Sequence, residues 1–210
     1  MIYPKNNPII FWAMHWYVKW RVARHFREVK YDNIPVDKGR SILLIANHYS
    51  FWDAMILYTV NIRLFKKRVH IMVLEETMHE YWQFKYGGMF SVKKSSRDAL
   101  NSLDYAAKLL ADPRNLVLIY PQGKLYSNFV TRVDFEKGIM RVIEKAGGKF
   151  QLVFAAGFIQ YLRNIKPTAT VYLKNANENF AGKNIDQLQA AYQQFYNEKR
   201  LEQTEIDAEQ

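Results

Sequence analysis

Short, continuously apolar runs alternate with longer amphipathic stretches, and this alternation most limits how the chain can fold. Residues 41–46 (SILLIA) and 116–120 (LVLIY) lack polar alternation, which is typical of strands buried on both faces of a parallel sheet. The stretches between such runs have apolar residues at helical spacing. Strands that alternate with helices predict an α/β fold with a largely parallel central sheet flanked by helices.

The individual elements follow from the same pattern. Strands are expected at residues 41–46, 69–74, 89–93, 116–120, 152–158 and 169–173. Helices are expected at residues 52–63, 97–111, 135–146 and 185–201. Gly147 and Gly148 follow the third of these helices, where a glycine in a left-handed conformation commonly ends a helix.

The organisation along the chain is simple. Its 210 residues suit one domain of ordinary size, and no internal repeat or low-complexity linker interrupts them. We expect an N-terminal amphipathic helix within residues 1–36, an α/β domain over residues 37–202 and a polar tail over residues 203–210. The chain contains no cysteine, which excludes disulfides, thiolate metal sites and a cysteine nucleophile.

The N-terminal segment, residues 9–30, has the composition of a helix that lies in a membrane surface. Its uncharged part, residues 6–18, is shorter than the about 20 residues that a spanning helix needs. No small-residue cleavage site follows it. Tryptophans next to lysine and arginine are typical of the headgroup layer. The apolar residues at helical spacing predict one stripe, made of Ile9, Trp12, Trp16, Trp20, Ala23 and Phe26. Trp12, Trp16 and Trp20 are the candidate membrane-docking residues; the alternative is a helix packed on the protein's own core.

A formal charge of +10 suits an anionic lipid surface, a nucleic acid or a phosphorylated substrate. Basic residues lie at several places rather than in one tract, as they do on ordinary solvated faces. The N-terminal aromatic residues cluster in an apolar helix and do not interleave with arginine on a sheet, which disfavours nucleic acid. We therefore predict a membrane lipid surface as a partner, and no nucleic acid.

The segment NHYSFWD, from Asn47 to Asp53, lies where a predicted buried strand ends and a predicted helix begins. Ligands of open α/β sheets commonly bind at such ends. His48 suits proton transfer near neutral pH, and the Asp53 carboxylate can accept the far ring N–H, which leaves the other nitrogen as a base. Taken alone, this spacing favours a structural interpretation, in which Asp53 caps the helix and His48 is simply hydrogen-bonded.

Three further blocks follow in order: residues 88–94 (GMFSVKK), 120–123 (YPQG) and 135–138 (FEKG). Together with NHYSFWD, an HX4D motif, they resemble the ordered blocks of the glycerolipid acyltransferase family, which includes lysophosphatidic acid and glycerol-phosphate acyltransferases. The resemblance covers about residues 41–158, over half of the chain. It implies an α/β acyltransferase domain with an N-terminal membrane-docking element.

The resemblance also implies roles for residues. His48, oriented by Asp53, would act as general base, so that a lipid hydroxyl attacks the thioester of acyl-CoA or acyl carrier protein directly. Neither a cofactor nor a metal is expected. Because acyl thioesters are made in the cytoplasm, the donor implies peripheral attachment to the cytoplasmic face of the cell (inner) membrane. The substrate-binding positions that the resemblance suggests are Asn47, Ser50, Gly88, Lys94, Arg97, Tyr120, Pro121, Gln122, Gly123 and Lys124; for Ser50, capping of the following helix is the alternative.

The blocks depart from the family where the family holds the phosphate and glycerol of its acceptor. Gln122 replaces the usual glutamate, Lys94 the usual arginine, and Lys124-Leu125 a common Thr-Arg pair. A lysine meets a phosphate as a point charge rather than as a bidentate fork. The departures predict a different hydroxylated lipid, such as a lysophospholipid-like lipid, an amino-acid lipid, a glycolipid or a pigment. The alternative is a non-catalytic lipid- or partner-binding relative of the same fold.

Overall fold

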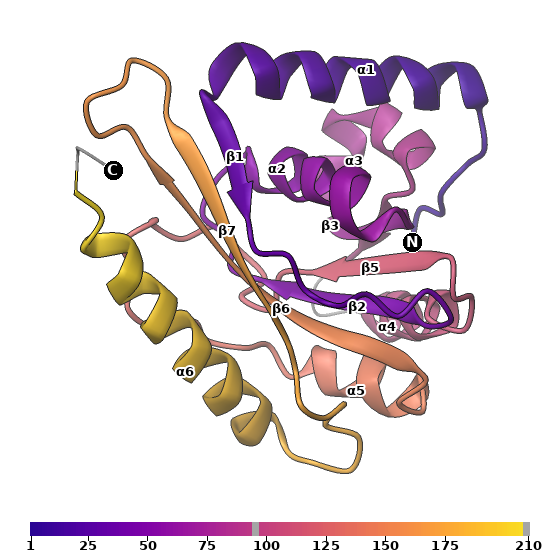
Figure 1. The fold of residues 1–210 in the computed structure, drawn as a ribbon. Coiled ribbons are helices and arrows are strands. Elements are labelled where there is room, and N and C mark those ends of the chain that lie inside the picture. Colours follow the sequence, from indigo (N-terminus) through magenta and orange to yellow (C-terminus); the bar gives the residue numbers. More distant parts are fainter. Residues whose placement is uncertain (94–96, 208–210) are drawn as a thin grey trace.

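A seven-stranded sheet forms the centre of the protein in a computed structural model that describes residues 1–93 and 97–207 (Figure 1). Its spatial order is β1-β7-β6-β2-β5-β3-β4. All neighbouring strands are parallel except β6 and β7, which pair antiparallel. The predicted α/β fold with a largely parallel sheet is therefore confirmed. The strands are β1 (Glu28–Tyr31), β2 (Ser41–Ala46), β3 (Arg68–Leu74), β4 (Phe90–Val92), β5 (Asn115–Ile119), β6 (Phe150–Gln160) and β7 (Thr168–Asn175).

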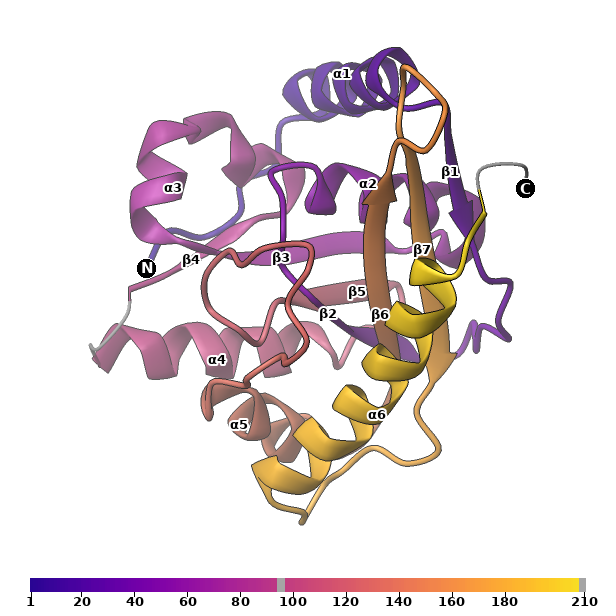
Figure 2. The same ribbon diagram turned by 90° about the vertical axis from the view of Figure 1, so that its left-hand side faces the viewer.

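Helices cover both faces of this sheet, as Figure 2 shows. On one side lie α1 (Pro8–His25), α2 (Asp53–Val60), the π-helical turn η1 (Asn61–Phe65), α3 (Glu75–Glu80) and the 3-10 helix η2 (Trp82–Gly87). On the other side lie α4 (Arg97–Leu109), α5 (Gly138–Lys145) and α6 (Ile185–Thr204).

Strand β2 shows how the sheet separates two cores. All six of its side chains are buried, because helices cover both faces. Leu43 and Ile45 join the core beneath α4, α5 and α6. Ile42 and Leu44 point the other way, into the core shared with α1 and α2. The period of two in a strand thus divides one apolar run between two layers.

The N-terminal helix is shorter than predicted. α1 begins at Pro8, where the Asn7 side chain accepts a hydrogen bond from the backbone N–H of Ile10, and it ends at His25. The residues after it form β1, an edge strand paired with β7, so the predicted segment 1–36 includes part of the sheet. Sequence reasoning missed β1 because its four residues include only one buried position.

The predicted apolar stripe of α1 is divided in the structure. Trp12, Trp16 and Trp20 are 54%, 61% and 56% exposed. Phe26, the last predicted member, is only 4% exposed and packs against Trp52 in the core. It lies beyond the end of the helix and therefore cannot share the face of the tryptophans. The stripe prediction is wrong at this position.

Other boundaries shift by a few residues, as helix ends commonly do. α5 begins at Gly138 rather than at residue 135, and it ends before Gly147 and Gly148, which have the predicted positive φ of 61° and 69°. α6 runs to Thr204, so the first residues of the predicted tail 203–210 are helical. Gln203 is buried, and its backbone oxygen accepts a hydrogen bond from the Gln160 side chain.

Candidate active site

The loop between β2 and α2 places the HX4D residues at the carboxyl end of the central strand. Its first residue, Asn47, is buried and bonds the backbone of β6 twice: its Nδ2 donates to the oxygen of Gly157 over 3.0 Å, and its Oδ1 accepts from the N–H of Gly157 over 2.8 Å. Asn47 therefore anchors the loop to the sheet. The structure gives it this structural position and not one on the cavity described below.

His48 and Asp53 meet as the sequence predicts. His48 Nδ1 lies 2.8 Å from Asp53 Oδ2. The same oxygen accepts the backbone N–H groups of Tyr49 at 2.8 Å and Ser50 at 3.0 Å, so three contacts hold the carboxylate. With Nδ1 directed at the carboxylate, the imidazole presents Nε2 as the free nitrogen, which is the tautomer that a general base requires.

Asp53 is the first residue of α2 and only 3% exposed. Burial raises the pKa of its carboxyl above the usual value, and the hydrogen bonds from His48, Ser50 and Tyr49 oppose that rise. Its second oxygen, Oδ1, is buried without a hydrogen-bond partner among the described residues. The carboxylate is thus held by donors that favour its charged form against the cost of burial.

The turn after β5 braces His48 from the other side. The Gln122 side-chain oxygen accepts the His48 backbone N–H over 2.7 Å, and the Tyr126 N–H donates to the His48 carbonyl over 3.0 Å. Gln122 is only 5% exposed. Gln122 is predicted as a substrate-binding residue, but in the structure its side chain points inward and holds the His48 backbone. An uncharged amide suits this buried contact better than a carboxylate would.

Tyr120 stacks on the imidazole. The two ring centroids lie 4.2 Å apart, with 18° between the planes. Burial raises the pKa of the Tyr120 phenol well above its ordinary value, with a smaller contribution from the nearby Asp53 carboxylate. The ring therefore remains neutral and confines His48 to one orientation.

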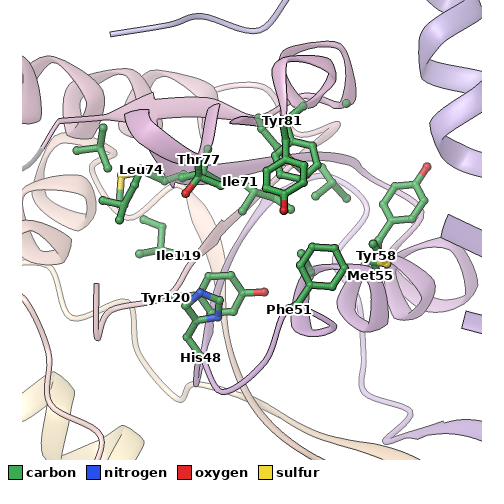
Figure 3. A pocket seen from close by; sticks show the side chains of 18 of the residues that line it. His48, Phe51, Met55, Tyr58, Ile71, Leu74, Thr77, Tyr81, Ile119 and Tyr120 are labelled. Atoms are coloured by element: carbon green, nitrogen blue, oxygen red, sulfur yellow. The ribbon is translucent and has the colours of Figure 1, made fainter. Parts of the chain in front are cut away.

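A cavity of about 730 Å³ lies against His48, within the range of small-molecule sites. In Figure 3, His48 and Tyr120 lie across the cavity from Thr77 and Tyr81, with Phe51 to one side. The part of the cavity wall that α1 contributes, which includes Met14, His15 and Val18, is called the roof. The wall is mainly apolar and includes Met14, Val18, Met55, Ile71, Leu74 and Ile119.

Sequence reasoning missed most of this wall. Thr77 on α3, Phe84 on η2 and Tyr81 between these two helices were not predicted as parts of a site. The polar pair inside the roof was missed as well: His15 Nδ1 lies 2.9 Å from the Tyr58 hydroxyl. An apolar pattern signals burial, but it does not distinguish a side chain that fills a core from one that borders an empty space.

The remaining predicted residues have separate places. Pro121, Gly123 and Lys124 line the cavity. Ser50 also lines it, and its hydroxyl accepts the Trp52 N–H over 3.0 Å within the loop. This is not the predicted alternative of a helix cap, because α2 begins after Trp52 without a side-chain cap.

Gly88 was predicted to bind substrate, but it packs against β3. Its φ is +87°, and a Cβ there would lie 2.2 Å from the carbonyl oxygen of Val69. Only glycine fits this close approach. Lys94 lies outside the described residues, and so does the side chain of Arg97, which begins α4.

The described residues contain neither a metal-binding cluster nor a membrane-spanning helix. Among residues 1–93 and 97–207, no three histidine, aspartate or glutamate side chains are grouped as a metal site would need. Within the same residues, none of the helices combines the length and apolar character required to cross a bilayer.

Comparisons with known proteins bear on the family and the fold. The model of a protein family described as Acyltransferase matches residues 25–156. The fold is similar to the crystal structure of the 1-acyl-sn-glycerophosphate (LPA) acyltransferase PlsC from Thermotoga maritima, with a TM-score of 0.63. The two sequences are 17% identical, and the match covers 94% of this chain and 80% of that chain. A search of curated proteins found no sequence that matches.

Proposed function

Because this chain belongs to the acyltransferase family, whose model matches residues 25–156, we propose that it is an O-acyltransferase acting on a lipid. It moves a fatty acyl group from the thioester of acyl-CoA or acyl carrier protein to a hydroxyl. The observation that carries this proposal is the His48–Asp53 pair, bonded over 2.8 Å, beside a large apolar cavity.

The proposed reaction needs no covalent enzyme intermediate. His48 Nε2 takes the proton of the acceptor hydroxyl, and the oxygen attacks the thioester carbonyl carbon. The carbon–sulfur bond then breaks, and the imidazolium returns the proton to the leaving thiolate. Asp53 fixes the His48 ring and stabilises its charged form. Gln122 holds the His48 backbone, and Tyr120 stacks on the face of the imidazole.

The apolar cavity suits the acyl chain. Each methylene that leaves water contributes about 0.8 kcal/mol, so a long chain binds strongly without any polar contact. The cavity wall as a whole is mainly apolar, which matches an acyl chain whose carbonyl lies at His48.

The acceptor that we propose is a hydroxylated lipid other than glycerol 3-phosphate or lysophosphatidic acid, such as an amino-acid lipid, a glycolipid or a pigment. Two positions support this proposal. Gln122, where the family usually has glutamate, bonds the His48 backbone and is not part of the cavity wall in the described chain. Lys124 lines the cavity, and a lysine meets a phosphate as a point charge rather than as a bidentate fork.

We further propose that α1 docks the enzyme on the cytoplasmic face of the cell (inner) membrane. Its exposed tryptophans, Trp12, Trp16 and Trp20, lie opposite the residues that roof the cavity. Lys19 lies over the Trp16 ring at 4.3 Å, an arrangement that suits the headgroup layer. The cavity then lies directly beneath the lipid surface that supplies the acceptor.

The decisive experiment measures thiol release from palmitoyl-CoA in the presence of a total lipid extract from the protein's own source. Wild type should release thiol and form an acylated lipid detectable by mass spectrometry. His48→Ala should slow the reaction by about 10²–10⁴-fold, because the general base is lost. Asp53→Asn should lose a similar factor, yet it should be at least as stable at neutral pH, because the buried carboxylate with its raised pKa is removed.

His79→Ala is the matched control. His79 is exposed on α3 and is not part of the cavity wall in the described chain, so its replacement should leave the rate unchanged. Equal rates in wild type and folded His48→Ala would exclude the pair from the chemistry. Absence of turnover with both acyl-CoA and acyl carrier protein would favour the non-catalytic binding relative.

A further inference from the structure

The tip of the β6–β7 hairpin, residues 161–166, exposes apolar side chains that the fold does not explain. Tyr161, Leu162 and Ile165 are 59%, 46% and 98% exposed. A hairpin tip in water is usually polar, and clustered exposed apolar side chains commonly mark an interaction surface. Arg163 and Lys166 are exposed in the same six residues. The hairpin tip therefore combines apolar and basic groups within one turn.

The fold brings this hairpin tip beside α1. The Arg27 N–H, just after α1, donates to the Pro167 carbonyl at the base of the hairpin over 2.9 Å. Immediately beyond these residues, β1 and β7 pair in parallel, with Glu28 opposite Thr168. Figures 1 and 2 both show the hairpin loop reaching the level of α1, next to its C-terminal end. The hairpin tip and α1 therefore lie side by side at the same end of the molecule.

We propose that the hairpin tip is a second lipid-binding site, which enters the same bilayer surface as the α1 tryptophans. The partner is an anionic phospholipid surface. Tyr161, Leu162 and Ile165 enter the boundary between headgroups and acyl chains, and Arg163 and Lys166 contact the phosphates. This inference rests on the proposed docking of α1 and adds to it a second point.

Two points of contact with the bilayer fix the orientation of the protein, which one helix alone does not. A single interfacial helix can rotate about its own axis, whereas a helix and a neighbouring loop together define the tilt of the protein on the bilayer. The roof of the cavity, which α1 contributes, is then held at a constant angle to the lipid surface. The hairpin tip is therefore a positioning surface for lipid access and takes no part in the chemistry.

Insertion can be read site by site because the chain has no cysteine. A single cysteine is introduced in the full chain by Ile165→Cys and labelled with an environment-sensitive NBD probe. Vesicles contain phosphatidylethanolamine with about one-third phosphatidylglycerol, which provides the anionic surface that basic residues recognise. We expect the emission to rise and shift to the blue, and to be quenched by lipids that carry a nitroxide on the acyl chain. Leu100→Cys, on the exposed face of α4 across the sheet, is the matched control and should not respond.

Binding by vesicle sedimentation gives the second measurement. Replacing both Tyr161 and Ile165 by serine should weaken vesicle affinity about tenfold or more, since several buried methylenes are lost. Arg163→Gln with Lys166→Gln should weaken affinity only on anionic vesicles and mainly at low salt. Leu100→Ser should bind as wild type does.

The outcomes separate the two proposals. A probe introduced by Trp16→Cys that responds, together with an Ile165→Cys probe that does not, would overturn the hairpin site and leave α1 docking intact. Silence of both probes would overturn the docking of α1 as well. A response of both, with unchanged palmitoyl-CoA turnover in detergent for the Tyr161 and Ile165 double variant, would support a role in lipid contact alone.

Discussion

The two longest helices of this protein, α1 with 18 residues and α6 with 20, use their apolar side chains in opposite ways. α6 buries Leu188, Tyr192, Phe195 and Tyr196 in the core and leaves polar side chains outside. α1 buries only Val22, roofs the cavity with one face and exposes tryptophans on the other. α6 therefore stabilises the fold, whereas α1 forms a wall of the cavity and an exposed apolar surface.

The largest expected difference between the helices is in stability. Phe195→Ala should lower the free energy of unfolding by about 3–5 kcal/mol, because it empties a packed position between β6 and α6. Trp16→Ala should change it by less than about 0.5 kcal/mol in the absence of lipid, since the side chain is mainly in solvent. Urea unfolding followed by circular dichroism measures both. A similar loss in the two variants would contradict the comparison.

The next effect concerns membrane binding. Replacing Trp12, Trp16 and Trp20 together by alanine should weaken vesicle affinity about 100-fold or more, because three large apolar side chains no longer leave water. Alanine keeps the helix, so circular dichroism should be unchanged. High salt should release only part of the wild-type protein, as expected for apolar insertion. Complete release by salt would mean that α1 binds by charge alone.

The smallest expected effect is a dependence of α1 on pH. Burial lowers the pKa of His15, and the charge of Lys19 lowers it further. The unfolded chain therefore binds a proton at His15 more readily than the folded protein does, so the contribution of His15 to stability is complete above the ordinary pKa of about 6.5 and falls as the pH drops below it.

Hydrogen exchange tests this dependence. Protection factors of α1 amides should decrease more between about pH 7 and pH 5.5 than those of α6, which contains no histidine. His70, whose pKa burial also lowers, contributes a decrease to the whole fold. His15→Gln, which cannot be protonated, should remove the extra decrease in α1. A decrease of the same size in His15→Gln would assign the effect to another group.

Much of the architecture could be predicted because it depends on short-range pattern. The residues of β2 were predicted without error, since a strand buried on both faces requires an unbroken apolar run. The meeting of His48 and Asp53 was also predictable, because five residues across a strand-to-helix turn bring the two side chains together. The family followed from the order of the four blocks, and the match to residues 25–156 confirms it.

The roles of single residues inside the site were less predictable. Gln122 lies 74 positions from His48 in the sequence, yet its side chain holds the His48 backbone. Gly88 was taken for a substrate-binding residue, but the close approach of β3 explains it. In both cases the deciding partner comes from a distant part of the chain, which no local pattern reveals.

The sequence by itself determined most of the element types, the HX4D pair and the basic, aromatic character of the N-terminal segment. Only the tertiary structure decided which apolar residues would fill a core, border the cavity or remain exposed. Phe26 and Trp16 have the same apolar spacing, but Phe26 is covered by Trp52 and the surrounding core, whereas Trp16 remains 61% exposed. Burial is a property of what packs against a side chain, and that partner is chosen by contacts far apart in the sequence.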